Sequence, residues 1–323
     1  MNTMKRDYSI DILKCFAVLI ITWSHFEKPL GDYSYLSTGG AFGDALFFFC
    51  SGYTIFLGRK ANGFLNWYKN RINRIYPTVF AWALVKSLLF NTSNNILEIL
   101  QTGGGYFVSC IMIFYVFYYF IKLYAIKHLN IVLLISILTT SCSYFILDNS
   151  NTYIMYLWQW SLYFSVMLLG GIIGRKRQQE SGMKNNVTYK TFIILFVSVI
   201  CYYSLMYLEQ KLSMNMIRMF TILPLLTFSY ALHKLCTAKI TERIYANKYA
   251  HIAIMTIGGL CLEIYLVQPR LLTDKFNSIF PFNLIIMFLI IFVSAYLLRC
   301  LSRIWMQTFK DGEYDWKAII KLY

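Results

Sequence analysis

Residues 281–298 read PFNLIIMFLIIFVSAYLL and contain no charged side chain. An α-helix needs about 20 apolar residues to cross about 30 Å of hydrocarbon. Strands are excluded as the spanning elements, because the run is continuously apolar and does not alternate between apolar and polar residues. The stretch therefore predicts a transmembrane helix, and similar stretches recur along the whole chain.

The overall composition agrees with a membrane protein. Of the 323 residues, 58% are hydrophobic and 14% are charged, whereas a soluble domain has about 45–50% apolar and about 25% charged residues. We predict an all-α, polytopic transmembrane helical bundle that forms a single domain over residues 1–323. About ten helices are expected, at about 9–27, 42–58, 75–91, 106–121, 130–147, 153–174, 190–208, 217–233, 252–269 and 281–298. The alternatives are eight or twelve helices, if a segment is re-entrant or misassigned.

Three features exclude other classes of protein or site. The net charge of +15 would suggest nucleic acid in a soluble protein, but here the basic residues occupy short loops, so we expect no nucleic-acid partner. The first apolar run is too long for a signal peptide and no A-x-A-like site follows it, so we expect a retained helix. The eight cysteines are scattered singly without a C-x-x-C pair, which predicts buried small side chains and no metal site.

The basic residues also predict the orientation. If the N-terminus, with Lys5 and Arg6, is cytoplasmic, 23 cations fall inside and only five outside. The inside loops include Arg59 and Lys60. The five outside are Lys28, Lys211, Arg218, Arg270 and Lys275. This bias predicts that both termini are cytoplasmic.

The first predicted helix contains Lys14 and His25, and ionisable groups inside a membrane helix are candidates for function. Over a continuous helix they would lie about 20° apart on one face and about 16 Å apart along the axis. Lys14 would then meet phosphate on the cytoplasmic side, and the deeper His25 would be a general base for a hydroxyl. The alternatives are a Lys14 that snorkels to the interface and a structural or interfacial His25.

Three further residues each leave two interpretations open. Asp44 either orients the imidazole, as the acid does in a Ser-His-Asp arrangement, or caps its helix at the interface. Asp11 either pairs with a lysine three residues on or is a charge favoured by the helix dipole. Glu263 either lines a cavity or pairs with a neighbouring helix. His233, at a predicted cytoplasmic helix end, is explained by interfacial placement.

Arg71 and Arg74 lie three residues apart in a basic and aromatic segment, residues 67–77. Arginine binds phosphate through paired N–H donors, so the two side chains are candidates for a phosphate site. The alternative is that they only mark the cytoplasmic side of the membrane.

Three motifs occur in order within about 70 residues: residues 11–17 followed by His25, residues 43–53 (GDALFFFCSGY) and residues 69–77 (KNRINRIYP). Together they resemble the acyltransferase 3 family of membrane-bound acyltransferases. That family has a cation and a histidine at this spacing in its first helix, then a Phe-Phe-x-x-Ser-Gly helix and an Arg-x-x-Arg-Ile-x-Pro segment. Lys14 stands where arginine is commoner, and Gln268 stands where histidine is common.

The resemblance implies transfer of an acyl group, usually acetyl, from acyl-CoA to a hydroxyl of a carbohydrate. His25 and Asp44 would be catalytic, whereas Lys14, Arg71 and Arg74 would bind acetyl-CoA as co-substrate, without a metal. The acceptor would be a cell-surface polysaccharide or its lipid-linked precursor. We expect a multi-pass protein of the bacterial plasma membrane, without the extracellular hydrolase-like domain that some relatives carry.

Two other functions make predictions that differ from those of an acyltransferase. A glycan or lipid transporter or flippase, without acyl transfer, predicts broken helices or internal repeats, and the sequence shows no convincing repeat. A polysaccharide polymerase predicts a large basic external loop, whereas the predicted external loops are short. Acetyl-CoA binding separates the acyltransferase from a pure transporter.

Overall fold

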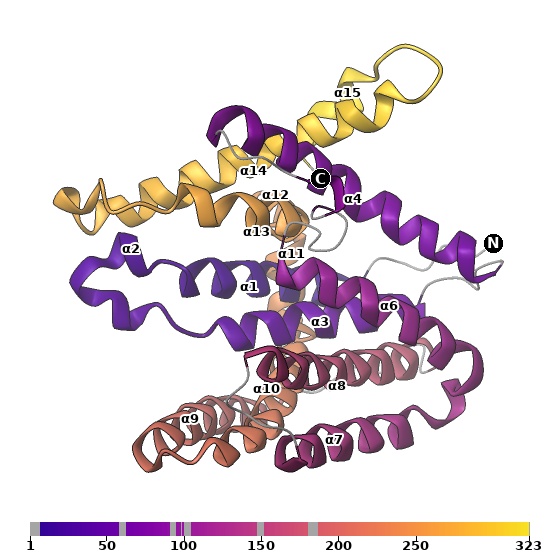
Figure 1. Cartoon of the computed structure of the whole chain (residues 1–323), viewed down its shortest axis with the longest axis vertical. Coiled ribbons are helices and arrows are strands. Elements are labelled where there is room, and N and C mark those ends of the chain that lie inside the picture. The colour runs from indigo at the N-terminus through magenta and orange to yellow at the C-terminus, as the bar shows by residue number, and fades with distance from the viewer. Residues whose placement is uncertain are drawn as a thin grey trace. The chain divides into compact units, whose positions relative to one another are not determined.

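The computed structural model describes residues 7–57, 63–90, 95–97, 99, 105–146, 152–179 and 187–322. In these ranges the regular structure is helical, as predicted (Figure 1). Five cations used for the orientation lie outside the described residues: Lys5, Arg6, Arg59, Lys60 and Lys184. The cytoplasmic placement of the termini therefore stays a prediction.

The described helices fall close to the predicted apolar runs. Those from the first half of the chain are α1 (Tyr8–Ser24), α2 (Glu27–Leu30), η1 (Gly31–Leu36), α3 (Gly40–Leu57), α4 (Phe64–Phe90), α6 (Tyr106–Tyr124), η2 (Ile126–His128) and α7 (Leu129–Ile146). Those that follow are α8 (Thr152–Gln179), α9 (Tyr189–Leu212), η3 (Asn215–Thr221), α10 (Ile222–Cys236), α11 (Lys239–Ala246), α12 (Lys248–Gly259), α13 (Cys261–Leu271), η4 (Asn277–Ile279), α14 (Phe282–Thr308) and α15 (Trp316–Ile320).

The expected number of ten crossings is not confirmed. Within the described ranges, seven helices are long and apolar enough to span a membrane, or up to nine if each of two bent pairs is one span. The predicted span at 75–91 is the one that is not among these candidates. It falls within α4, which begins earlier, at Phe64. Its first half carries Arg71 and Arg74, which leaves too short an apolar stretch for a clear crossing.

Both bent pairs have a local cause. The chain turns by 62° between α1 and the segment that begins at Glu27. Pro29 has no N–H to donate to the carbonyl of His25, so the first helix cannot continue through this point. The chain turns by 68° between α12 and α13, where Gly259 closes one helix before the next begins. The sequence analysis did not predict either break.

The described chain separates into two compact units, each assembled from discontinuous segments. Unit 1 comprises Met1–Ala17, Ala41–Arg59 and Phe120–Ile254, and unit 2 comprises Val18–Gly40, Lys60–Tyr119 and Met255–Tyr323.

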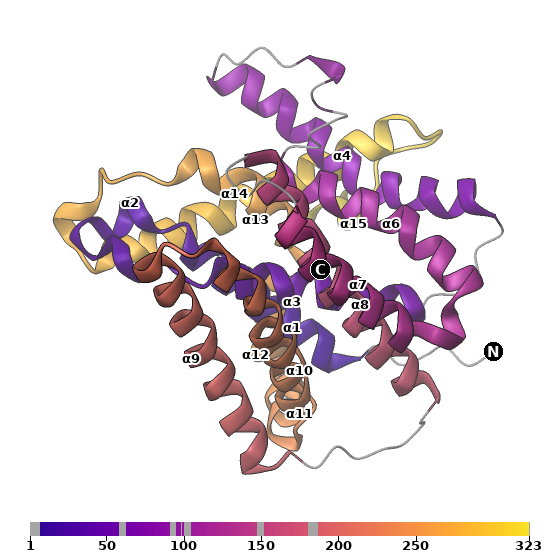
Figure 2. The same cartoon turned by 60° about the horizontal axis from the view of Figure 1, so that its bottom comes forward.

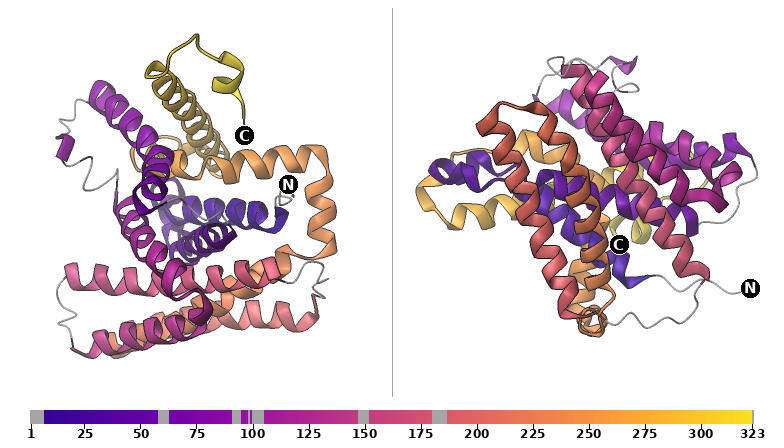
Figure 3. Two further views of the ribbon diagram at one scale, coloured as in Figure 1. Left: turned by 90° about the vertical axis from the view of Figure 1, so that its right-hand side faces the viewer. Right: turned by 90° about the horizontal axis from the view of Figure 1, so that it is seen from below.

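In unit 1, α3 and α8 run parallel and touch through their backbones. A Cβ on Gly52 would lie 1.9 Å from the carbonyl oxygen of Met167, and one on Gly170 would lie 2.1 Å from that of Phe49. Such close approach requires glycine, as in small-xxx-small helix contacts of membrane proteins. Around this pair, α7 packs on α8 and α9 packs on α10 (Figures 2 and 3).

In unit 2, α14 is the central helix and packs against α4 and α13. Thr78 and Ser302 share a buried hydrogen bond of 3.0 Å between α4 and α14. Near the other end of α14, Phe288 packs on Phe26, with ring centroids 4.6 Å apart. The bend after α1 is therefore held by side-chain packing as well as by Pro29.

Candidate functional site

His25 lies in a turn and not in the first helix. Helix α1 ends at Ser24, and the backbone N–H of His25 donates to the carbonyl of Thr22 at 3.2 Å. The prediction that Lys14 and His25 share one helical face requires a continuous helix over 9–27. Because α1 ends at Ser24, that face does not extend to His25. The side chain of His25 is exposed, whereas Lys14 is half-buried within α1.

Asp44 is held in the first turns of α3 by α8. The hydroxyl of Tyr163 donates to Oδ2 of Asp44 at 3.3 Å. The amide of Gln159, one turn earlier on α8, donates to the same hydroxyl at 3.4 Å. The carboxylate therefore ends a chain of polar groups within unit 1, and its predicted partnership with His25, a residue of unit 2, stays a prediction.

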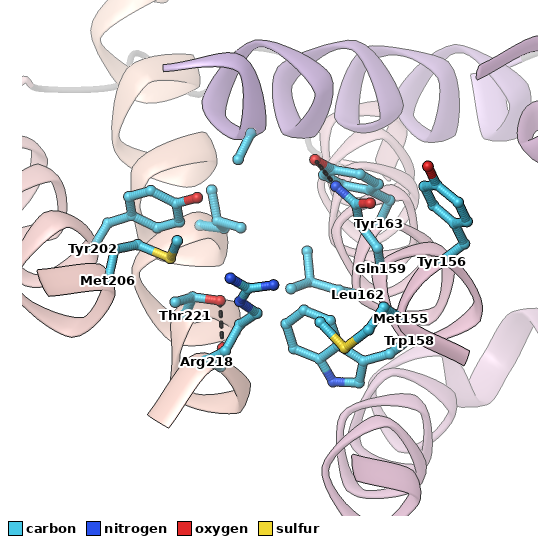
Figure 4. Close-up of a pocket in the computed structure, with 12 residues that line it drawn as sticks. Met155, Tyr156, Trp158, Gln159, Leu162, Tyr163, Tyr202, Met206, Arg218 and Thr221 are labelled. Carbon is cyan, nitrogen blue, oxygen red and sulfur yellow. Dashed lines mark hydrogen bonds between the residues drawn. The ribbon is translucent and has the colours of Figure 1, made fainter. Parts of the chain in front are cut away.

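This chain of polar groups borders a cavity in unit 1. The cavity has a volume of about 350 Å³ and is lined by the start of α3, the first half of α8, the end of α9, η3 and the start of α10. Figure 4 shows Arg218, Thr221 and Met206 on one side, and Leu162, Trp158 and Gln159 on the other. Pockets for small molecules have volumes of about 300–1,000 Å³ and a mostly apolar or aromatic lining with a few polar groups, and this cavity has that character.

Arg218, the one cation among the described residues that line the cavity, is neutralised by a neighbouring acid. Nε of Arg218 donates to Oε2 of Glu209 at 3.0 Å, and Nη2 lies 2.9 Å from Oε1. This two-point contact joins η3 to the end of α9. From the sequence, Arg218 was only one of the five cations expected outside the membrane. The sequence feature that could have predicted this contact is an acid and a base nine residues apart, Glu209 and Arg218, on either side of a predicted connection between two helices.

Arg71 forms a separate candidate site in unit 2. Its guanidinium packs over the rings of Trp67 and Tyr115, with Cζ 5.0 Å and 5.3 Å from the two centroids. Nε of Arg71 is buried and has no hydrogen-bond partner among the described residues. A buried N–H donor without a partner is costly, so this atom is suited to bind an acceptor that the described residues do not supply.

Arg74 adds a second cation close to the first. Burial lowers the pKa of Arg71, Tyr115 acts in the opposite direction, and the charge of Arg74 lowers the pKa further. Arg74 itself is exposed. An anion between the two side chains would reduce both the repulsion and the cost of burial. The binding of phosphate by Arg71 and Arg74 stays a prediction.

The sequence model of the acyltransferase domain of the acyltransferase 3 family matches residues 7–302. The chain belongs to the acyltransferase 3 family. Comparison with curated proteins and with solved structures found no significant match. With its spanning helices, the chain is a multi-pass membrane protein of an acyltransferase family, as the three motifs predicted.

The family match extends over both units and includes all five predicted site residues. Lys14 and Asp44 belong to unit 1, whereas His25, Arg71 and Arg74 belong to unit 2. Within the described residues, no group of three or more His, Cys, Asp or Glu side chains is arranged to hold a metal ion. The roles of the five residues in acyl transfer are proposals.

A polar network at the opposite end of α3 was not predicted for this acyltransferase. Asp7 precedes α1 and accepts hydrogen bonds from the hydroxyls of Ser9 and Tyr53, both at 2.6 Å. The ring of His233 lies 5.4 Å from that of Tyr53. The interfacial placement predicted for His233 is wrong, because its side chain is 5% exposed and its Nε2 is buried without a hydrogen-bond partner among the described residues.

The structure also decides between the two interpretations of Glu263. Glu263 forms a two-point contact with Arg299 of α14, at 3.2 Å and 3.0 Å, so it pairs with a neighbouring helix. Asp11 lies in the first turn of α1 and accepts a hydrogen bond from Tyr245 at 2.8 Å. Gln268, which stands where the family commonly has histidine, is fully buried, and neither polar atom of its amide has a partner among the described residues.

Proposed function

We propose that this chain is a membrane O-acetyltransferase. It transfers the acetyl group of acetyl-CoA to a hydroxyl of a cell-surface polysaccharide or of its lipid-linked precursor, at the bacterial plasma membrane. Family membership supports acyl transfer. The observation that carries the choice of donor is that the buried Nε of Arg71, beside Arg74, has no hydrogen-bond partner in the described part of the chain.

The donor fits this site because coenzyme A carries several phosphate groups. Arg71 is fixed by two aromatic rings, so its N–H donors lose little freedom when they bind a phosphate. A planar guanidinium can give two parallel hydrogen bonds to phosphate, and such charge-assisted bonds are stronger than neutral ones. We assign Lys14 to the same donor as a point charge.

His25 is proposed as the general base. Its imidazole would accept the proton of the acceptor hydroxyl while the oxygen attacks the thioester carbonyl. The carbon–sulfur bond then breaks, the acetyl group is left on the sugar oxygen, and the departing CoA sulfur takes up a proton. Histidine suits this role because its ordinary pKa lies near the working pH. Asp44 is proposed as the second catalytic group, on its place in the family's second motif.

The test replaces His25 with alanine and measures transfer of labelled acetyl from acetyl-CoA to surface glycans in membranes. We expect a loss of at least about 100-fold, because general-base catalysis typically contributes about 10²–10⁴-fold. The matched control is His128→Ala, since His128 is exposed on η2, and this variant should retain transfer. Full transfer by a well-expressed H25A variant would disprove the proposed role.

One observation favours the second candidate, a transporter or flippase. The two bent pairs, at 62° and 68°, are the broken helices that such proteins use at their binding sites. Binding of acetyl-CoA to the purified protein in nanodiscs separates the two candidates. A pure transporter binds none, whereas the acetyltransferase binds it and loses affinity in the Arg71→Gln variant.

A further inference from the structure

The cavity of unit 1 combines aromatic faces with hydrogen-bonding groups. Tyr202 and Tyr163 border it from α9 and α8, and Trp158 and Leu162 form an apolar wall (Figure 4). Gln159 and Arg218 supply N–H donors at its rim. A sugar ring has this same division, since its C–H face packs on aromatic rings and its hydroxyls need polar partners.

The charge around the cavity discriminates between sugars. Among the residues that the structure describes, Arg218 is the only cation that lines it, and two of its three nitrogens already contact the carboxylate of Glu209. The pair has no net charge. A second carboxylate, Asp44, lies behind Tyr163 at 3.3 Å. An anionic sugar would therefore meet a neutralised ion pair and one further carboxylate behind Tyr163, whereas an uncharged sugar meets no repulsion.

The hydrogen bonds from Gln159 to Tyr163 and from Tyr163 to Asp44 link this cavity to the second family motif, which contains Asp44. A hydroxyl-bearing ligand in contact with Tyr163 would share the hydroxyl that donates to Asp44. An acyl chain of a lipid would use neither this hydroxyl nor the donors of Gln159 and Arg218. Within unit 1, Tyr163, Gln159 and Arg218 each have a polar partner, but Gln159 and Arg218 carry further N–H groups. Burying those N–H groups beneath a lipid tail that offers no acceptor is costly, which favours a sugar.

We infer that this cavity binds an uncharged sugar ring of the acceptor, with Tyr202 against its apolar face and Arg218 and Gln159 on its hydroxyls. The inference rests on the proposed O-acetyltransferase function and specifies the class of acceptor. It also assigns Tyr202, Gln159 and Arg218 to acceptor binding, a role that does not depend on the donor residues of unit 2.

The first experiment measures transfer of labelled acetyl by the full chain in nanodiscs, with unacetylated glycan from cells that lack this protein as acceptor. Tyr202→Leu removes the ring, and we expect the half-saturating glycan concentration to rise about fivefold or more. Half-saturation by acetyl-CoA should stay within about twofold. The control is Tyr207→Leu, since Tyr207 is on the same helix, is exposed and does not line the cavity.

A second variant separates binding from folding. Gln159→Leu keeps the size of the side chain and leaves the Arg218–Glu209 contact in place, so the protein should fold. It should also raise the half-saturating glycan concentration without changing that of acetyl-CoA. If both variants fold and neither alters the glycan dependence, the inference is overturned. If the unaltered chain transfers no acetyl to any glycan, the proposed function itself fails.

Competition then tests the charge argument. Methyl glycosides of neutral hexoses and the corresponding uronic acids are added as probes to the transfer reaction. We expect at least one neutral glycoside to compete with the glycan, and its competition to weaken in the Tyr202→Leu variant. Equal or stronger competition by a uronic acid would overturn the assignment to uncharged sugars. Competition by dodecanol but by none of the sugars would show a lipid-chain pocket instead.

Discussion

The hydroxyl of Tyr53 lies 2.6 Å from Oδ2 of Asp7 and joins the end of α3 to the residue before α1. Burial raises the pKa of Asp7, but the hydrogen bonds from Ser9 and Tyr53 outweigh this effect. The net pKa is below the ordinary value of 3.8. The folded protein therefore holds this carboxyl in its ionised form more strongly than the unfolded chain does.

A pH dependence of stability follows from this shift. A group whose pKa is lowered on folding stabilises the protein above its unfolded pKa and loses this effect as the pH falls through the folded pKa. Thermal unfolding in nanodiscs, followed from about pH 6 to about pH 3, should show stability falling below the ordinary pKa of Asp7. Tyr53→Phe should lower stability by about 1–3 kcal/mol near neutral pH and flatten this part of the profile. An unchanged profile in Tyr53→Phe would contradict the assignment to Asp7.

The glycine contact between α3 and α8 predicts a strong steric effect. A Cβ on Gly52 would lie 1.9 Å from the carbonyl oxygen of Met167, so the two backbones must move apart in Gly52→Ala. We expect a loss at or above the upper end of about 1–3 kcal/mol, the usual cost of overpacking. The measurement is the thermal midpoint of the purified protein. Ser51→Ala, at the neighbouring position, should change it little, and equal midpoints for the two variants would refute the backbone contact.

The Arg71 site predicts a selective effect on the acyl donor. Arg71→Gln should raise the half-saturating acetyl-CoA concentration about tenfold or more, because a charge-assisted contact to phosphate is lost. The glycan dependence should be unchanged. Lys69→Gln removes the same charge from an exposed residue on the same helix, and it should have an effect below about twofold. Equal effects of the two variants would mean that only the general positive charge of this segment matters.

The pair of Glu263 and Arg299 predicts non-additive effects on stability. Their side chains are only 8% and 12% exposed, so Glu263→Gln leaves a nearly buried guanidinium without its counter-charge, at a cost of about 3–5 kcal/mol. Replacing both residues with methionine should recover part of this loss. A double-mutant cycle on thermal unfolding measures the coupling, and simple additivity of the single changes would show that the two side chains do not interact.

The apolar runs were sufficient to predict the helical architecture, and the motifs around Lys14, His25, Asp44 and Arg71 were sufficient to predict the family. The exact ends of the helices were harder to predict from the sequence. The break after Ser24 depends on Pro29, a local signal that hydropathy alone does not weigh. The early start of α4 at Phe64 was missed because its first half is polar and is stabilised by tertiary contacts such as the packing of Arg71 on Trp67 and Tyr115.

The cavity could not be predicted, because its lining comes from segments far apart in the chain. Arg218 and Glu209 are ordinary helix-end charges in the sequence, and only the fold pairs them and places Arg218 across a cavity from α8. His233 was assigned to the interface for a similar reason, since its burial depends on Phe49 and Tyr53 of another helix.

The sequence by itself determined that this protein is a helical membrane acyltransferase, because hydrocarbon permits only continuously apolar helices of a certain length and the family motifs are contiguous in the chain. The tertiary structure decided which polar groups face one another: Asp44 with Tyr163, Glu263 with Arg299 and Arg218 with Glu209. Such pairs depend on how helices cross, and close crossing depends on side chains as small as those of Gly52 and Gly170.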